Sequence, residues 1–365
     1  MKNSIKFLLY NVLFFILLII ITEIIFGSWF KSDSFGSTIR NGRLKDRLYE
    51  VVHNDKKYVF RYKKNYYGFR GEEIDPKKIK IFFLGGSHGN EKYTPEELTI
   101  VGRLNNFFIS NDNNEIKIYN ASQDGFSSHG YKKFFTKFYP KIKNFNPEKM
   151  ILYIGLRDGI LCKNFIINKD GYDQFQSKQV WDNLVEINKV KRVKDFIKNN
   201  SFFVGKIKII QFKYFNKENQ KIETVASQKR KSYIYTQSTK DYMNFYEAKK
   251  KFSEVEMEKK YSSCKQSFLD NLNEILMLTE KNKIKILLIN NINYKGVSDD
   301  WLFYINMLIA NFAMENSLPF INLSKIKDIS VSDFYDDNHT TPEGSDKIAK
   351  FIYPEVAKFL ENNEW

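Results

Sequence analysis

The sequence is poor in cysteine, histidine and proline. Its 365 residues include two cysteines, four histidines and seven prolines. Two cysteines are too few for a disulfide framework and have no metal-ligand spacing, which excludes a small disulfide-stapled fold and a cysteine-based metal site. We expect Cys162 and Cys264 to be buried and unpaired, with one disulfide in an oxidising compartment as the alternative.

Acidic residues are outnumbered by basic ones. The chain has 58 Lys and Arg against 43 Asp and Glu, a net charge of +15. Such a charge suits an anionic partner such as an acidic glycan, a teichoic-type polymer, lipid headgroups or nucleic acid. Lysine is spread along the whole chain, however, and the sequence has no zinc-finger, helix-turn-helix or Gly-aromatic RNA-binding signature. We therefore expect no nucleic acid partner.

The sequence also lacks internal repeats and Pro-rich or Ser-rich linkers that would separate independent domains. Hydrophobic residues make up 42% and aromatic residues 16% of the chain, which supplies a substantial core. The length suits one large globular domain or two small ones.

One long apolar run is present at the N-terminus. Between residues 7 and 30 the only strongly polar residues are Asn11, Thr22 and Glu23. A run of about 20 apolar residues spans a bilayer, and this one lacks the small-x-small exit of a cleaved signal peptide. We predict that residues 1–30 form an uncleaved signal-anchor transmembrane helix.

The charges that flank this run leave its orientation ambiguous. Lys2 and Lys6 precede it, whereas five basic residues follow it: Lys31, Arg40, Arg43, Lys45 and Arg47. Positive charge on both sides satisfies the positive-inside rule in neither direction. Because large domains translocate despite flanking charge, we expect a single-pass protein of the cytoplasmic membrane with its body outside, and a cytoplasmic body as the alternative.

The rest of the chain alternates strand and helix patterns. Residues 31–77 read as an irregular lead-in, and residues 78–365 as the folded domain. Apolar strand runs lie at 79–85, 115–121, 148–155, 282–289 and 318–323, and helical patterns at 96–109, 261–282, 299–316 and 342–363. This alternation predicts an α/β fold with a parallel sheet covered on both faces. Pro354 is expected to kink or divide the last helix. Residues 163–254 show no clear sheet element and read as an insertion.

The first strand runs into a glycine-rich turn, "LGGSHGN", that contains Ser87. The turn matches neither the G-x-G-x-x-G dinucleotide fingerprint nor the G-x-x-x-x-G-K-[ST] phosphate loop. A nucleophile at Ser87 is the better interpretation, because functional groups gather at the carboxyl edge of a parallel sheet.

A base for this nucleophile is available near the C-terminus. Asp336 and His339 are three residues apart, a spacing that places both side chains on one face of a turn. The carboxylate can then hold one ring nitrogen while the other faces a serine. His53, His88 and His129 are poorer candidates by position, and Asp333 and Asp337 lack this spacing and read as solvated loop acids.

Four short blocks resemble those of the SGNH hydrolases, also called GDSL esterases. They are "LGGSHG", "YNASQDGFSS", "YIGLRDG" and "DDNHTTPEG", in the family's order, within residues 66–360. The resemblance implies a flavodoxin-like three-layer α/β/α sandwich of about five strands. It also implies Ser87, Asp336 and His339 as the catalytic residues, and the backbone N–H groups of Ser87 and Gly125 as oxyanion donors. Asn120 reads as a strand-end hydrogen-bonding residue.

Two positions depart from the family pattern. Gly86 stands where the family has Asp, and Arg157 stands where it has the oxyanion-hole Asn. A guanidinium can replace that donor, bind an anionic group of the substrate, or swing out and leave the hole incomplete. An ion pair of Arg157 with Asp158 or a nearby acid is the structural alternative.

The resemblance and the anchor together imply an esterase or O-acyltransferase. The expected substrate is an acylated, most simply O-acetylated, envelope polysaccharide or glycan, and a multi-pass membrane acyltransferase is a candidate partner. Hydrolysis and transfer share the acyl-enzyme, so the motifs do not separate them. No metal and no organic cofactor is indicated. The alternative from another class is a catalytically impaired scaffold that binds a glycan or such an acyltransferase.

Overall fold

The computed structural model describes residues 2–27, 29, 43, 45–113, 115–168, 197, 201–210, 223–225 and 242–361. The chain forms two compact units, one of Met1–Arg40 with Leu184–Ile222 and the other of Asn41–Asn183 with Glu223–Trp365. The larger unit contains the predicted sheet and every predicted site residue, and the smaller one contains the apolar N-terminal helix.

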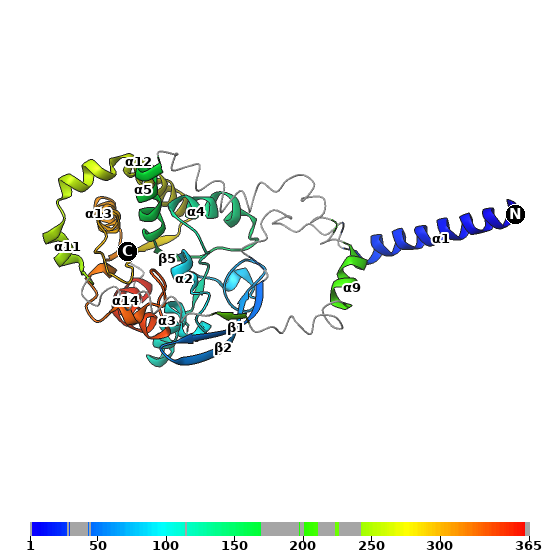
Figure 1. The fold of residues 1–365 in the computed structure, drawn as a ribbon, viewed down its shortest axis with the longest axis horizontal. Helices are drawn as coiled ribbons and strands as arrows, with labels where there is room; N and C mark the ends of the chain where they lie inside the picture. The colour runs from blue at the N-terminus through cyan, green and yellow to red at the C-terminus, as the bar shows by residue number, and fades with distance from the viewer. Residues whose placement is uncertain are drawn as a thin grey trace. The chain divides into compact units, whose positions relative to one another are not determined.

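A five-stranded parallel sheet forms the centre of the larger unit (Figure 1). Its order across the sheet is β4 (Ile118–Asn120), β3 (Ile81–Gly85), β5 (Lys149–Tyr153), β7 (Lys285–Ile289) and β8 (Phe320–Ile321). Each strand lies inside a predicted run, and all four pairings are parallel. The order is the 2-1-3-4-5 arrangement of flavodoxin-like folds, so the predicted fold class is confirmed.

The register of the sheet aligns the strand ends that carry the motifs. Gly85 at the end of β3 pairs with Tyr153 at the end of β5, which in turn pairs with Ile289 at the end of β7. Every residue of β3 and β5 is buried, as expected for central strands with helices on both faces. The segments that follow these strands therefore leave the sheet at one edge.

Helices cover the two faces of the sheet in separate groups (Figure 1). On one face α3 (Ile100–Ser110) packs against α14 (Pro342–Glu361). On the other face lie α4 (Ser128–Lys133), α5 (Leu156–Asn168), α12 (Glu254–Lys281) and α13 (Asp300–Glu315), with α11 (Phe245–Lys251) against α13. The larger unit is thus an α/β/α sandwich.

Helix α14 begins where the sequence predicts. The Thr341 hydroxyl accepts a hydrogen bond from the Gly344 backbone N–H at 3.2 Å, which caps the first turn. Pro342 occupies the first helical position, where its missing N–H costs nothing. The helix continues through Pro354, so the predicted division at this proline is not seen.

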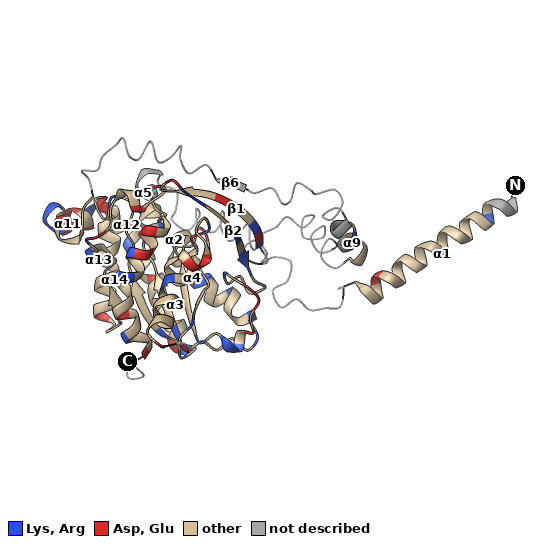
Figure 2. Ribbon diagram, turned by 90° about the horizontal axis from the view of Figure 1, so that it is seen from below, with Lys and Arg blue, Asp and Glu red and all other residues tan. Residues whose placement is uncertain are grey.

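The lead-in is more regular than the sequence suggests. Residues 45–64 were expected to be irregular, but β1 (Lys45–His53) and β2 (Lys56–Lys64) form an antiparallel hairpin, and β6 (Glu223–Val225) adds to β1 in parallel. Lys and Arg lie along both hairpin strands (Figure 2). These charges mask the strand alternation, which places Tyr49 and Tyr62 in a buried cluster on the other face.

Cys162 of α5 and Cys264 of α12 form a disulfide bond, with their Cα atoms 5.5 Å apart. Both side chains are buried, as predicted, but the expectation that they are unpaired is wrong. The two residues are 102 positions apart, and the intervening insertion returns the chain so that α5 and α12 pack together. Local sequence patterns carry no information on that return.

The predicted insertion at 163–254 is described in part. It contains α11, β6 and α9 (Phe202–Ile210), the last of which belongs to the smaller unit. Residues 169–196, 198–200, 211–222 and 226–241 of it lie outside the described residues.

The smaller unit consists, in its described part, of α1 (Lys2–Phe26), the residues just after it, and the segment around α9. Residues Ile5–Phe26 of α1 have a mean hydropathy of 2.6 and are long and apolar enough to cross a membrane. Within Ile5–Phe26 the charged residues are Lys6 and Glu23. The N-terminal apolar helix is therefore as predicted, and a signal sequence would have the same features.

Candidate active site

Ser87 lies at the start of a short helix at the carboxyl end of β3. Gly86 has extended backbone angles, and α2 (Ser87–Asn90) begins at the serine. A Cβ atom on Gly86 would lie 2.9 Å from Cε1 of His88 and 3.3 Å from the carbonyl oxygen of Phe126. A side chain at position 86 would therefore require the buried His88 ring to shift. The helix ends at Glu91, which has a positive φ of 46°.

The structure brings Ser87, His339 and Asp336 together although the serine and histidine are 252 residues apart. Nε2 of His339 lies 2.7 Å from Oγ of Ser87. Nδ1 of His339 lies 2.8 Å from each carboxylate oxygen of Asp336. These are the contacts that a serine nucleophile, a general base and an orienting acid require.

Asp336 is held in its ionised form. Burial raises the pKa of its carboxyl, but hydrogen bonds from the His339 ring and from the backbone N–H groups of Asn338 and His339 outweigh burial and lower the pKa below its usual value. The ring of Tyr335 stacks on that of His339, with centroids 5.6 Å apart and planes inclined by 12°. The imidazole therefore has its tautomer and its plane fixed from two sides.

A buried network connects the histidine loop to the serine turn. Oε1 of Glu91 accepts hydrogen bonds from the hydroxyls of Thr340 and Ser345, and its Oε2 accepts from the Ile100 N–H at 2.7 Å. Burial raises the pKa of the Glu91 carboxyl to about 7, against the opposing effect of these bonds and of Arg70. Because Thr340 follows His339 and Glu91 ends the helix that Ser87 begins, the network fixes the two segments relative to each other.

Gly125 lies in the loop after β4, close to the serine turn. The carbonyl of its neighbour Phe126 packs against Gly86, and Asn90 of α2 donates a hydrogen bond to Asp124 at 2.7 Å. Gly125 has a φ of 80°, which glycine adopts without strain. Its role as an oxyanion donor stays a prediction.

Asn120 ends β4 and makes the strand-end hydrogen bonds that the sequence suggests. Its Nδ2 donates to the carbonyl of Gly89 at 2.8 Å, and its Oδ1 accepts from the Ser122 N–H at 3.0 Å. This side chain therefore ties the second motif block to the helix of the first.

Arg157 and Asp158 lie in the first turn of α5, and their side chains have different environments. Asp158 is fully buried and accepts hydrogen bonds from the N–H and hydroxyl of Ser128, whose hydroxyl also accepts from Asn271. Arg157 is half-buried, and burial lowers the pKa of its guanidinium while the Asp158 charge raises it. Asp158 thus anchors α4 to α5, and the role of Arg157 at the oxyanion position stays a prediction.

The lead-in supports the site from outside the sheet. The buried Arg70 guanidinium donates to the backbone carbonyls of Asn90, Glu91 and Thr94. The buried Nζ of Lys64 donates to the carbonyl of Ser122 at 2.6 Å, and burial lowers the pKa of Lys64 to about 7. Both basic residues hold loops of the first two blocks in place through main-chain atoms.

The remaining histidines lie outside this arrangement, in line with the sequence analysis. His53 contacts the carbonyl of Tyr93 through Nε2 at 2.9 Å. His88 is buried edge-on against Tyr153, and burial lowers its pKa to about 3, so it is neutral at neutral pH. His129 is half-buried in α4.

Of the two acids interpreted as solvated, Asp337 is exposed and Asp333 is not. The buried Asp333 carboxylate accepts hydrogen bonds from the Ser330 N–H at 2.7 Å and from Lys347 at 2.8 Å. The solvated interpretation of Asp333 is therefore wrong, because the final helix brings Lys347 to it.

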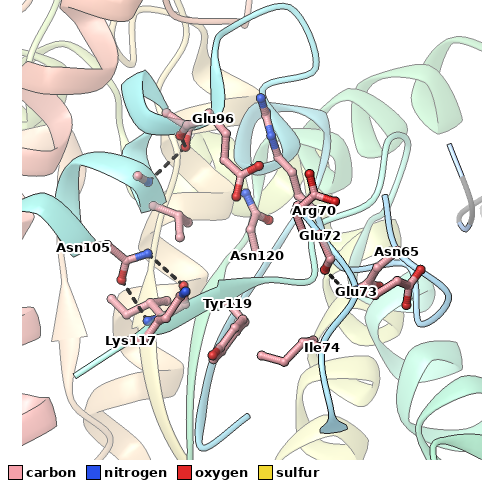
Figure 3. A pocket seen from close by; sticks show the side chains of 15 residues that line it. Asn65, Arg70, Glu72, Glu73, Ile74, Glu96, Asn105, Lys117, Tyr119 and Asn120 are labelled. Carbon is pink, nitrogen blue, oxygen red and sulfur yellow. Dashed lines mark hydrogen bonds between the residues drawn. The ribbon is translucent and has the colours of Figure 1, made fainter. Parts of the chain in front are cut away.

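A separate polar cavity of about 160 Å³ lies between the lead-in, the start of α3 and β4 (Figure 3). Arg70, Glu96, Asn105 and Lys117 are among its lining residues, and none of Ser87, Asp336 and His339 lines it. Nε of Arg70 has no hydrogen-bond partner among the described residues, which suits an ordered water molecule in this space. This cavity is therefore distinct from the arrangement of Ser87, His339 and Asp336.

Sequence reasoning missed the supporting residues. Glu91, Lys64 and Arg70 are buried ionisable side chains that meet their partners across distant parts of the chain. Lys64 and Arg70 fall in the segment that was expected to be an irregular lead-in. No local pattern distinguishes any of the three from surface charges.

No family model matches the chain, and no curated protein matches its sequence. Among the solved structures to which the chain is similar are the following three. A putative acylhydrolase from Bacteroides fragilis shares 13% identity over 77% of this chain and 87% of its own, with a TM-score of 0.38. A GDSL-like lipase from Bacteroides thetaiotaomicron shares 13% identity over 79% of this chain and 91% of its own, with a TM-score of 0.37. An acetyl xylan esterase shares 13% identity over 76% of this chain and 100% of its own, with a TM-score of 0.41. At these identities and scores, the functional conclusion rests on the geometry of the site.

Proposed function

We propose that this chain is a membrane-anchored serine esterase or O-acyltransferase of the SGNH hydrolase type. The observation that carries the proposal is the continuous hydrogen-bonded arrangement of Ser87, His339 and Asp336 at the carboxyl edge of the sheet. Its physical logic is that a neutral serine hydroxyl becomes a nucleophile only when a neighbouring base accepts its proton.

The reaction proceeds through an acyl-enzyme. Oγ of Ser87 attacks the ester carbonyl carbon while Nε2 of His339 takes the hydroxyl proton, and Asp336 stabilises the imidazolium. The bond from the carbonyl carbon to the leaving alcohol then breaks, and the alcohol oxygen takes the proton from Nε2. Water or a sugar hydroxyl next attacks the acyl carbon and gives its proton to Nε2. The bond from the acyl carbon to Oγ then breaks, and Oγ takes the proton from Nε2, which restores Ser87.

The oxyanion formed in each step needs hydrogen-bond donors. The N–H groups of Ser87 and Gly125 are the proposed backbone donors, and loss of one side-chain donor typically costs about a hundred- to a thousandfold in rate. Arg157 is the proposed third donor, and it carries a charge as well as N–H groups. Arg157 is half-buried, and its proposed role is to donate to the oxyanion or to bind an anionic group of the substrate.

The anchor and the disulfide support an envelope substrate. A disulfide between Cys162 and Cys264 forms and persists in an oxidising compartment, which favours a body outside the cytoplasmic membrane. An O-acetylated cell-envelope glycan is then the substrate within reach, and a multi-pass membrane acyltransferase is the partner that would supply acyl groups if the reaction is transfer.

The test uses the full-length protein in detergent with a fluorophosphonate probe and p-nitrophenyl acetate. We expect stoichiometric labelling and acetate release by the wild type, and neither by Ser87→Ala. Ser110→Ala, which removes an exposed hydroxyl bonded only within its own helix, serves as the matched control and labels like the wild type.

Folded wild-type protein that takes up no probe and releases no acetate contradicts the enzyme. Binding without catalysis is the second candidate function, and Arg157 in place of the oxyanion Asn favours it. In that case we expect retention of an O-acetylated glycan by both the wild type and Ser87→Ala.

A further inference from the structure

Helix α1 carries an acidic side chain near the end of its apolar run. The run Ile5–Phe26 has 22 residues, which at about 1.5 Å per residue matches a hydrocarbon core of about 30 Å. Glu23 lies in the last turn of the run. A carboxylate at this depth is costly unless it has partners. Asn11, by contrast, is satisfied within its own helix, because its Nδ2 donates to the Phe7 carbonyl at 2.8 Å.

The partners of Glu23 come from the insertion, about 180 residues further along the chain. Its carboxylate accepts hydrogen bonds from the Ser201 hydroxyl at 2.5 Å, the Phe202 N–H at 2.9 Å and the Phe203 N–H at 3.2 Å. Trp29 donates to the same carboxylate at 3.0 Å. The first N–H groups of α9, which have no partner within their own helix, are thus satisfied by α1.

Helix α9 is too short to be stable in water by itself. It has nine residues and a glycine at 205, whereas isolated helices below about 12 residues are marginal and an interior glycine costs about 1 kcal/mol. Phe203 and Ile207, one turn apart on the same face, remain 37% and 52% exposed. The cap at Glu23 satisfies the helix end but leaves this apolar face to another medium.

The contacts of α9 place it beside the apolar surface of α1 (Figure 1). The ring centroids of Phe26 and Phe202 are 5.5 Å apart. An apolar groove of about 580 Å³ runs between the two helices, lined by Phe15, Leu18, Ile19, Thr22, Glu23 and Phe203. The ammonium of Lys206 lies 5.5 Å from the Phe202 ring, the kind of placement from which a lysine extends to headgroups.

We propose that α9 is a second membrane-contacting element, which lies in the bilayer interface with Phe203 and Ile207 in lipid and with acyl chains in the groove beside α1. The inference rests on the proposed membrane span of α1, because a lipid surface continuous with that span is what covers the exposed face. The chain then meets the bilayer twice, once before the lead-in and once within the insertion that follows α5. The insertion thereby attaches the chain to the membrane at a second point.

The experiment uses the full-length protein in nanodiscs of phosphatidylethanolamine and phosphatidylglycerol. A polarity-sensitive NBD probe is attached to a single introduced cysteine, with the native pair closed as a disulfide. Ile207→Cys tests α9, Leu13→Cys reports the middle of α1, and Val255→Cys is the matched control, an apolar residue 79% exposed on α12. We expect doxyl-lipid quenching at positions 207 and 13 only, and dithionite reduction about tenfold slower at 207 than at 255.

The outcomes separate the inference from the anchor proposal. Quenching at position 13 with an aqueous probe at position 207 overturns the inference and leaves the anchor intact. An aqueous probe at both positions overturns the anchor as well. A probe at 207 that is shielded from dithionite but not quenched by doxyl lipid shows that another protein helix covers α9, which also overturns the assignment to lipid.

A second variant tests the role of Glu23. Glu23→Ala removes the cap from α9, so we expect dithionite to reach the 207 probe about as fast as the 255 probe in this background. Asn11→Ala, which removes a polar group of α1 that bonds only within α1, leaves the 207 probe shielded. Equal shielding in both backgrounds contradicts the docking of α9 through Glu23.

Discussion

Asp336 controls His339 through both carboxylate oxygens, each 2.8 Å from Nδ1. Asp336→Asn keeps the shape but offers an N–H to Nδ1, which favours the tautomer that cannot accept the serine proton. We expect kcat for p-nitrophenyl acetate to fall about 10⁴-fold with KM little changed. Asp337→Asn, at the exposed neighbouring position, is the control. A loss below about tenfold in Asp336→Asn contradicts the assigned role.

Glu91 makes the stability of the fold depend on pH. Its pKa is about 7 in the folded protein against 4.5 when exposed, so the folded state binds more protons between these values and stability falls as pH rises through them. The shift corresponds to about 3 kcal/mol. We expect Glu91→Gln, which stays neutral, to gain stability relative to the wild type by about 2–3 kcal/mol between pH 5 and pH 8.

Urea unfolding at the two pH values measures this difference. The exposed Glu97 lies on the same segment, and Glu97→Gln is expected to follow the wild type at both values. A difference between Glu91→Gln and the wild type that does not change with pH shows that the Glu91 carboxyl ionises normally in the fold.

At the scale of elements, the disulfide joins two helices that flank the insertion. It closes a loop of about 100 residues between α5 and α12, and loss of a native disulfide typically costs about 2–5 kcal/mol. We expect the double variant Cys162→Ala and Cys264→Ala to unfold at lower urea concentration, with dithiothreitol affecting the wild type only. Equal effects of the reductant on both proteins contradict the bond.

The lead-in shows how a segment outside the motifs supports the candidate site. Arg70 and Lys64 extend from the lead-in toward the edge of the sheet. Arg70 binds main-chain carbonyls that follow the first motif block, and Lys64 binds one in the second block. Because every residue has a main-chain carbonyl, these contacts require no particular residue type in the motif blocks. The rigidity of the serine turn therefore depends on residues outside the motifs.

At the scale of the whole molecule, the disulfide supports the proposed orientation, which the flanking charges leave open. The basic residues on both sides of α1 do not decide it, whereas the disulfide favours an oxidising compartment. We expect alkaline phosphatase fused after Trp365 to be active in bacterial cells and a green fluorescent protein fusion at the same place to be dark. The reverse result places the body in the cytoplasm.

The sequence by itself determined the α/β fold and the meeting of Ser87 with His339. Apolar runs and helical periods are local patterns, so the sequence predicted the five strands and the helices between them. In a parallel sheet the carboxyl ends of the strands lie at one edge. Residues that follow those strands must then converge. The i, i+3 spacing of Asp336 and His339 is local in the same sense.

Only the tertiary structure decided which distant residues pair. The bond of Cys162 to Cys264, the burial of Glu91 beside Ser345 and the docking of α9 on Glu23 join positions 102, 254 and about 180 residues apart. A local pattern records which face of an element is apolar but not which element will cover it. Such contacts are selected by the packing of the whole chain, where a buried charge is tolerated only beside its partner.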